Sequence, residues 1–175
     1  MQVLSVASEV YPLIKTGGLA DVAGALPGAL AGHGVDMRTL VPGYPKVLGA
    51  LEGAASVYSF PSLYGGPSEI LSARAGELRL LVLKAPHLFE RGGGPYGDET
   101  GKDWPDNWMR FAALSRAAAT IAEIGAGGFK PDIVHVHDWQ AALTAAFLKY
   151  GPASATPSAA PAAPFTRTTT STSGN

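Results

Sequence analysis

The stretch KTGGLADV, residues 15–22, is the part of the sequence that most strongly predicts the fold. It stands between a short apolar run at residues 2–8, typical of a strand, and an amphipathic run at residues 19–31, typical of a helix. A glycine pair between a strand and a helix lets an anion approach the backbone, where the first helical amides point toward it. Lys15 adds a positive charge at the same place. The alternative is an ordinary turn, in which the glycines supply conformational freedom and the lysine is solvated.

The segments around this stretch predict an α/β fold with a Rossmann-like parallel sheet flanked by helices. A second strand pattern at residues 35–41 completes a strand-helix-strand unit, whose crossover is expected to be right-handed. Short strand patterns at residues 55–60, 68–73 and 78–84 are separated by Gly and Pro turns, which predicts a small β-meander inserted beside the sheet. The helix at residues 19–31 is expected to bury one stripe, formed by Leu19, Val22, Ala23, Leu26 and Leu30.

The second half of the domain repeats the alternation of helix and strand. Residues 104–124 keep a helical period, residues 133–137 show the pattern of a buried strand, and residues 139–150 predict a further helix. Three aromatic side chains near the start of the long helix are interpreted as core or as the wall of a cleft: Trp104, Trp108 and Phe111.

Residues 151–175 differ in composition from the rest of the chain. Of these 25 residues, 20 are Ala, Pro, Ser or Thr, and only Arg167 is charged. Such a segment has too little apolar surface to form a core, so we predict a disordered tail after a folded domain at residues 1–150.

Composition and charge exclude several classes of function. The net charge is −1 without a cluster of Lys or Arg, so neither nucleic acid nor an acidic membrane is expected as the main partner. The chain has no cysteine, which excludes disulfides and thiolate zinc sites. No segment reads as a signal peptide or a membrane span, so the expected location is the cytoplasm.

Three common nucleotide or nucleophile motifs are missing. The first strand is not followed by Gly-x-Gly-x-x-Gly, and neither Gly-x-x-x-x-Gly-Lys-Ser/Thr nor Gly-x-Ser-x-Gly occurs. A nicotinamide enzyme, a P-loop ATPase and an esterase are therefore poor fits.

The second informative segment is DIVHVHDW, residues 132–139. Alternation along a strand places His135 and His137 on one face. His137 and Asp138 then fall at the carboxyl end of the strand, where open α/β sheets bind their ligands.

Three interpretations of this segment stay open. One histidine can be a satisfied core residue while Asp138 caps the next helix. A metal site is the second interpretation, but only His33 and His87 are left to complete a pair formed by His135 and His137. The third is recognition of a sugar or nucleotide, in which the carboxylate accepts hydroxyl protons and the imidazole donates or accepts.

A third candidate element is the loop GPYGD, residues 94–98, with Tyr96 at its centre. Its tyrosine either lines a ligand site or anchors a glycine-rich loop.

Taken together, these segments resemble the bacterial glycogen synthases and plant starch synthases. The resemblance covers residues 1–150, and its elements follow one another in the order Ser8-Glu9, residues 15–22, residues 85–91, Pro95-Tyr96 and residues 133–139. It implies the amino-terminal half of a GT-B glycosyltransferase, in which two Rossmann-like domains face a cleft. It also implies transfer of glucose from ADP-glucose to the non-reducing end of an α-1,4-glucan with retention, without a metal or other cofactor.

The resemblance implies a role for particular residues. Those expected to bind ADP-glucose or glucan are Lys15, Gly17, Gly18, Asp21 and Tyr96. His137 and Asp138 are expected at the catalytic centre, where they hold sugar hydroxyls or the reacting face. Two other functions stay open: a non-catalytic module that binds glucan or adenine nucleotide, and a metal-dependent hydrolase built on His135 and His137.

The resemblance also predicts what this chain lacks. A synthase is more than twice as long, and its second domain carries the Arg, Lys and Glu that hold the diphosphate and glucose. Residues 151–175 are predicted to be a frameshifted translation, because one shifted frame is compatible with the next strand of the family. The chain alone is therefore expected to be inactive and marginally stable, with a sheet that ends on an unpaired edge.

Overall fold

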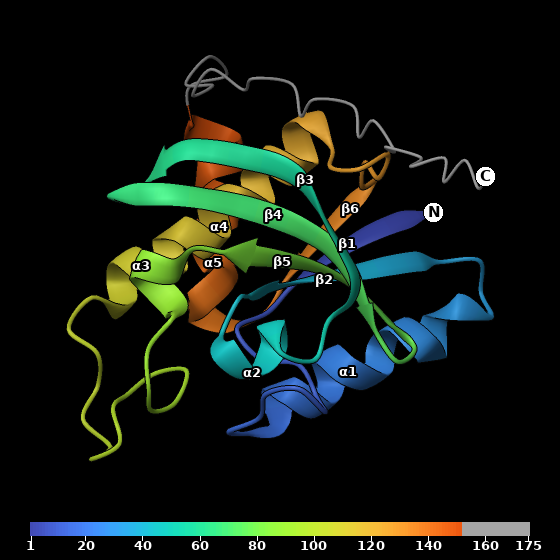
Figure 1. Cartoon of the computed structure of the whole chain (residues 1–175). Coiled ribbons are helices and arrows are strands. Elements are labelled where there is room, and N and C mark those ends of the chain that lie inside the picture. Colours follow the sequence, from blue (N-terminus) through green and yellow to red (C-terminus); the bar gives the residue numbers. More distant parts are fainter. Residues whose placement is uncertain (152–175) are drawn as a thin grey trace, which may run out of the picture.

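A computed structural model describes residues 1–151, which form one mixed sheet flanked by helices (Figure 1). The predicted tail lies outside these described residues, apart from Gly151. The strands are β1 (Gln2–Val6), β2 (Asp36–Pro42), β3 (Glu52–Leu63), β4 (Gly66–Ala75), β5 (Leu78–Lys84) and β6 (Ile133–Val136). The helices are α1 (Gly18–Ala31), α2 (Pro45–Leu48), α3 (Pro86–Phe89), α4 (Asn107–Ile124) and α5 (Asp138–Tyr150).

The sheet has six strands in the order β3-β4-β5-β2-β1-β6. The four strands from β5 to β6 pair in parallel, whereas β3 and β4 pair antiparallel with each other and β4 with β5. This confirms the α/β prediction and the strand-helix-strand unit formed by β1, α1 and β2. The predicted meander is present, and its last strand, β5, is also a member of the parallel part, so the meander extends the main sheet.

The helices cover opposite faces of the sheet. The connection through α1 runs from β1 toward β2, and the connection through α4 runs from β5 back past β2 and β1 to β6. Right-handed crossovers in opposite directions place α1 and α4 on opposite faces, and α5 packs beside α4 (Figure 1).

The predicted buried stripe of α1 is confirmed only in part: Ala23 is buried, and Leu19, Leu26 and Leu30 are half-buried. Only Ala20 and Ala23 of α1 are buried, and Val22 is 53% exposed. The reason is close packing through small residues: a side chain on Gly24 would come within 2.5 Å of the Tyr11 carbonyl oxygen.

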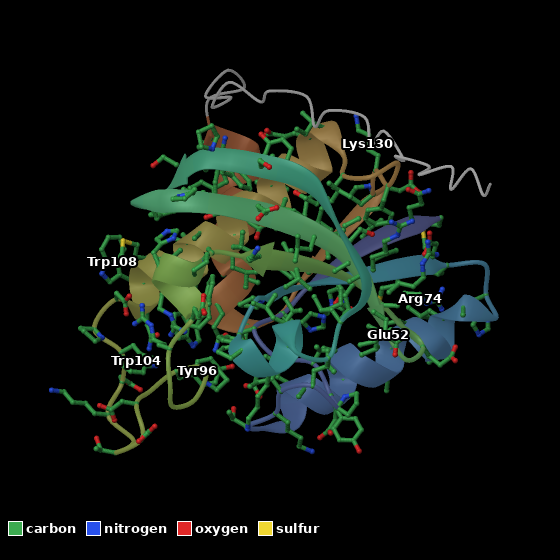
Figure 2. All side chains as sticks on the ribbon, viewed as in Figure 1. Glu52, Arg74, Tyr96, Trp104, Trp108 and Lys130 are labelled. Atoms are coloured by element: carbon green, nitrogen blue, oxygen red, sulfur yellow. The ribbon has the colours of Figure 1, made fainter. Side chains whose placement is uncertain are left out.

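Two further burial predictions are wrong. Strand β6 has the sequence pattern of a buried strand, but Ile133 and His135 are exposed. The strand is an edge of the sheet within residues 1–151, which agrees with the unpaired edge that was also expected. Trp108 was predicted as core or cleft wall, but it is 68% exposed and projects from the molecule (Figure 2). Phe111, three residues later, is buried as predicted. The period of apolar residues alone does not determine which face of a strand or helix packs against another element.

No helix within residues 1–151 combines the length and the apolar character needed to cross a membrane.

Candidate functional site

Three segments converge at the carboxyl edge of the parallel strands. They are the segment after β1, the loop that contains Tyr96, and His137 with Asp138 after β6. Strands β1 and β6 are neighbours, with Val6 aligned to Val136, but the chain leaves them toward helices on opposite faces. In open α/β sheets, ligands generally bind beyond the strand ends at such a reversal of the connections. The segment after β1 lies on one side of this point, and His137 and Asp138 lie on the other.

Glu9 and Tyr96 form the best-connected polar pair at this edge. Glu9 is only 2% exposed, and its carboxylate accepts hydrogen bonds from the Tyr96 hydroxyl at 2.5 Å, the Thr16 hydroxyl at 2.7 Å and the Thr16 backbone N–H. The Tyr96 and Ser8 hydroxyl oxygens lie 2.8 Å apart. Burial, and then the hydrogen bond to Glu9, raise the pKa of Tyr96 far above its ordinary value, so the phenol stays neutral and remains a donor. Tyr96 thus ties the glycine-rich loop to the segment after β1.

Helix α4 holds the Tyr96 loop through side-chain hydrogen bonds. The Asn107 side chain donates to the Tyr96 carbonyl at 2.7 Å, and Arg110 Nη1 donates to the Pro95 carbonyl at 2.8 Å and to Asn107 Oδ1 at 2.6 Å. The ring of Phe111 lies 5.8 Å from that of Tyr96. Sequence reasoning missed Asn107 and Arg110; the available signal was an arginine among the apolar positions of a helix.

Lys15 lies at the amino end of α1, as predicted, and is paired with Asp21 in the first turn. Its ammonium group is 2.7 Å and 2.6 Å from the two carboxylate oxygens of Asp21. The two side chains are about half exposed, so the ion pair contributes at most about 1 kcal/mol. The lysine also lies 5.8 Å from the centre of the Tyr11 ring. A weak, solvated pair leaves Lys15 able to turn toward another anion.

Gly17 and Gly18 are not required by the conformation of the chain. Gly17 precedes α1 with φ −146° and ψ −164°, an extended backbone that any residue adopts, and Gly18 begins the helix. A Cβ atom added at either position would meet nothing within 4 Å. The turn interpretation is therefore unsupported, because neither a positive φ nor close packing inside the chain demands glycine here.

His137 lies at the carboxyl end of β6, in contact with β1. Its Nε2 atom is 3.1 Å from the Ser5 hydroxyl, and its ring lies 4.3 Å from that of His135, as the alternation along β6 predicted. Burial, and then the charge of His135, lower the pKa of His137, while Asp138 acts in the opposite direction. His137 is therefore neutral at pH 7 and available as a single donor and a single acceptor.

Asp138 is exposed and has an unusual backbone. It is the first residue of α5 with φ +57°, a conformation that non-glycine residues rarely adopt. The residue at the capping position is His137, and its side chain makes no capping hydrogen bond, so the interpretation of Asp138 as a helix cap is unsupported. Trp139 next to it packs edge-on against Phe111, with the ring centres 5.3 Å apart.

His135 and His137 lie close together, but no further ligand completes a metal site in the part of the chain that the structure describes. No group of three or more His, Asp or Glu side chains within residues 1–151 is placed to hold a metal ion. His87 instead donates from Nε2 to the Leu63 carbonyl at 3.0 Å.

Comparison with known proteins identifies the family of the chain. The family model of the starch synthase catalytic domain matches residues 2–166. The glycogen synthase of Rhodopseudomonas palustris (strain BisA53) is 61% identical over 158 residues, which is 89% of this chain and 32% of the relative. The glycogen synthase of Mesorhizobium japonicum is 58% identical, over 90% of this chain and 33% of the relative.

A solved structure shows the same fold. The catalytic domain of starch synthase IV from Arabidopsis thaliana, bound to ADP and acarbose, aligns with a TM-score of 0.65 and 28% identity over 85% of this chain. This confirms the predicted GT-B relationship. The chain spans about a third of the length of the curated relatives it matches. By its sequence and by its fold, this chain belongs to the starch synthase catalytic domain family.

Proposed function

We propose that this chain forms one wall of the active site of a glycogen synthase, which transfers glucose from ADP-glucose to the non-reducing end of an α-1,4-glucan with retention. The observation that carries the proposal is the pair Gly17 and Gly18, which leaves an open approach to the amino end of α1 beside Lys15. Glycogen synthases with 55–65% identity to this chain, and a similar starch synthase bound to ADP and acarbose, support the choice of reaction.

The chemistry of glucosyl transfer explains why such an approach is useful. Cleavage of the anomeric bond leaves positive charge on the sugar and negative charge on the departing diphosphate. Donors that are already in place stabilise that charge best, and the amino end of a helix with an adjacent cation supplies them. Lys15 exchanges a weak, solvated contact with Asp21 for a stronger charge-assisted contact with the diphosphate.

The residues that follow β6 are suited to sugar hydroxyls. The exposed carboxylate of Asp138 can accept hydrogen bonds, and neutral His137, which lies against Ser5 of β1, can donate or accept. The positive φ of Asp138 costs about 1–3 kcal/mol, a strain that proteins keep mainly at functional sites. The hydrogen bond between buried Glu9 and half-buried Tyr96 holds the loop after β1 in place between these two groups of residues.

The experiment joins this chain to the second domain of a glycogen synthase relative and measures glucosyl transfer. In Lys15→Ala we expect kcat/KM to fall roughly tenfold to a hundredfold, which corresponds to about 1.5–3 kcal/mol for one charge-assisted contact. Lys130→Ala is the matched control, because this exposed lysine lies at the end of the molecule away from Tyr96 (Figure 2). An unchanged kcat/KM in a well-folded Lys15→Ala variant would falsify the assigned role.

Separate titrations distinguish the two alternative functions. Saturable binding of ADP, ADP-glucose or malto-oligosaccharide by the joined protein, without turnover, would identify a binding module. Stoichiometric zinc, manganese or iron that is lost on mutation of His135 and His137 would identify a metal-dependent enzyme and contradict the proposed metal-free chemistry.

A further inference from the structure

We propose that a cavity beside the candidate active site binds a small oxyanion of the phosphate class, held by Arg110 and Tyr44. The cavity has a volume of about 450 Å³ and lies between the segment that follows β2 and the glycine loop that follows α3. It involves none of the residues that the resemblance assigned to ADP-glucose or glucan, so this binding site goes beyond the proposed function.

Arg110 contributes a buried positive charge with unused donors. Its side chain is 0% exposed, and Nε and Nη1 donate to the carbonyls of Leu88 and Pro95, each at 2.8 Å, and to the Asn107 amide oxygen. Nη2 has no partner among residues 1–151, and none of the groups that Arg110 bonds there is a carboxylate. Burial without a hydrogen-bonded counter-charge is costly for a guanidinium, and an anion against Nη2 would offset that cost.

The nearby acid is already engaged. Asp106 acts on Arg110 only through its charge, because both of its carboxylate oxygens accept hydrogen bonds from Arg91, each at 2.9 Å. Arg91 also lies with its guanidinium 4.9 Å from the centre of the Trp104 ring. This pairing leaves buried Arg110 without a hydrogen-bonded carboxylate among the described residues; its guanidinium lies 5.2 Å and 5.6 Å from the ring centres of Phe89 and Phe111.

Tyr44 contributes a second unused donor to the same cavity. It is 4% exposed, its ring packs edge-on against Phe89 at 5.6 Å, and its hydroxyl has no partner within the described residues. Burial raises the pKa of Tyr44 far above its ordinary value, so the hydroxyl keeps its proton. A water molecule can accept from such donors, but only an anion also compensates the charge of Arg110.

The rim of the cavity limits the size and charge of the ligand. Lys46 lies exposed at the rim and favours an anion, whereas the exposed carboxylate of Glu90 opposes one. The glycine loop is held in shape by Gly93, which has φ +78° and lies so close to Gly97 that a Cβ would come within 2.7 Å of its carbonyl oxygen. A preformed cavity of this size admits inorganic phosphate or a small phosphate monoester.

The test measures binding of inorganic phosphate and of glycerol phosphate to the full 175-residue chain by isothermal titration calorimetry, with chloride as the control anion. Tyr44→Phe keeps the ring and should weaken phosphate binding about tenfold, the loss typical of one hydrogen bond to a charged ligand. Tyr58→Phe is the matched control, since Tyr58 is a second buried tyrosine with an unpaired hydroxyl and does not line this cavity. Its affinity for phosphate should equal that of the unmodified chain.

Two rim variants give effects of opposite sign and do not depend on a core substitution. Lys46→Ala should weaken binding severalfold, and Glu90→Gln should strengthen it severalfold. Tighter binding of glycerol phosphate than of inorganic phosphate would indicate a phosphorylated metabolite, and equal binding would indicate free phosphate; both support the site. Absence of saturable binding, or an affinity unchanged in both Tyr44→Phe and Glu90→Gln, overturns the proposal.

Discussion

Helices α1 and α4 cover opposite faces of one sheet, yet they bury different amounts of their surface. Eleven residues of α4 are buried, because it packs against both the sheet and α5, whereas α1 buries only Ala20 and Ala23. Each helix also serves the candidate site in its own way. Helix α4 holds the Tyr96 loop through buried side chains, while α1 presents an exposed amino end. The difference separates the part of the molecule that stabilises the site from the part that is free to meet a ligand.

The largest effect on stability should come from α4. Replacing Arg110 with Met leaves the carbonyls of Leu88 and Pro95 without their donor, so unfolding should become easier by about 3–5 kcal/mol. Arg79→Met is the control, because its exposed ion pair with Asp36 is worth less than about 1 kcal/mol. Urea denaturation monitored by circular dichroism measures both. Equal losses for the two variants would contradict the structural role assigned to Arg110.

The second largest effect on stability should come from the loop that α4 supports, which contains Tyr96. Tyr96→Phe removes a donor from the buried Glu9 carboxylate and should destabilise the chain by about 1–3 kcal/mol. The pKa of Tyr96 is raised in the folded state, so the unfolded chain loses this proton first as pH rises above about 10, the ordinary value for tyrosine. The contribution of Tyr96 to the free energy of unfolding therefore decreases above that pH. Denaturation at pH 8 and pH 11 should therefore show a smaller alkaline loss in Tyr96→Phe. A variant with the full alkaline loss would refute this assignment.

Substitution of two glycines in the α1 region should have different effects on stability. Gly24→Ala places a Cβ against the Tyr11 carbonyl oxygen and should cost about 1–2 kcal/mol, even though alanine favours a helix by about 1 kcal/mol. Gly17→Ala meets nothing in the chain and should change stability by less than about 0.5 kcal/mol. Thermal unfolding of the two variants provides the comparison. In the protein joined to its second domain, Gly17→Ala should nevertheless lower glucosyl transfer, and full activity would argue against an approach for ligand at this point.

The smallest effect should come from the exposed ion pair on α1. Asp21→Asn removes a carboxylate from the first helical turn and its contact with Lys15, with an expected loss of roughly 0.3–1 kcal/mol. Because both groups are solvated, the difference from the unmodified chain should shrink in 1 M salt. A loss above this range that persists in high salt would show that the amino end of α1 is more tightly packed than its exposure indicates.

The sequence predicted where the site residues lie along the strands and helices better than it predicted which side chains pack around them. Alternation along residues 133–137 correctly placed His135 and His137 together, and the order of strand, glycines and helix correctly placed Lys15 at the start of α1. The roles of Lys15, Gly17, Gly18, Asp21, Tyr96, His137 and Asp138 in binding and catalysis stay predictions. The frameshift proposed for the tail also stays a prediction, because its residues lie outside the described part.

What the sequence determined by itself is local: the period of each element, the places where elements begin and end, and the motifs of the family. The tertiary structure decided which faces are buried, because burial depends on the neighbour that packs there. Val22 is exposed on α1 although its period marked it as buried, and the edge position of β6 exposes Ile133. The tertiary structure also decided that Glu9 contacts Tyr96 and that His137 contacts Ser5. These contacts join residues 87 and 132 positions apart, separations at which periodicity carries no information on contact.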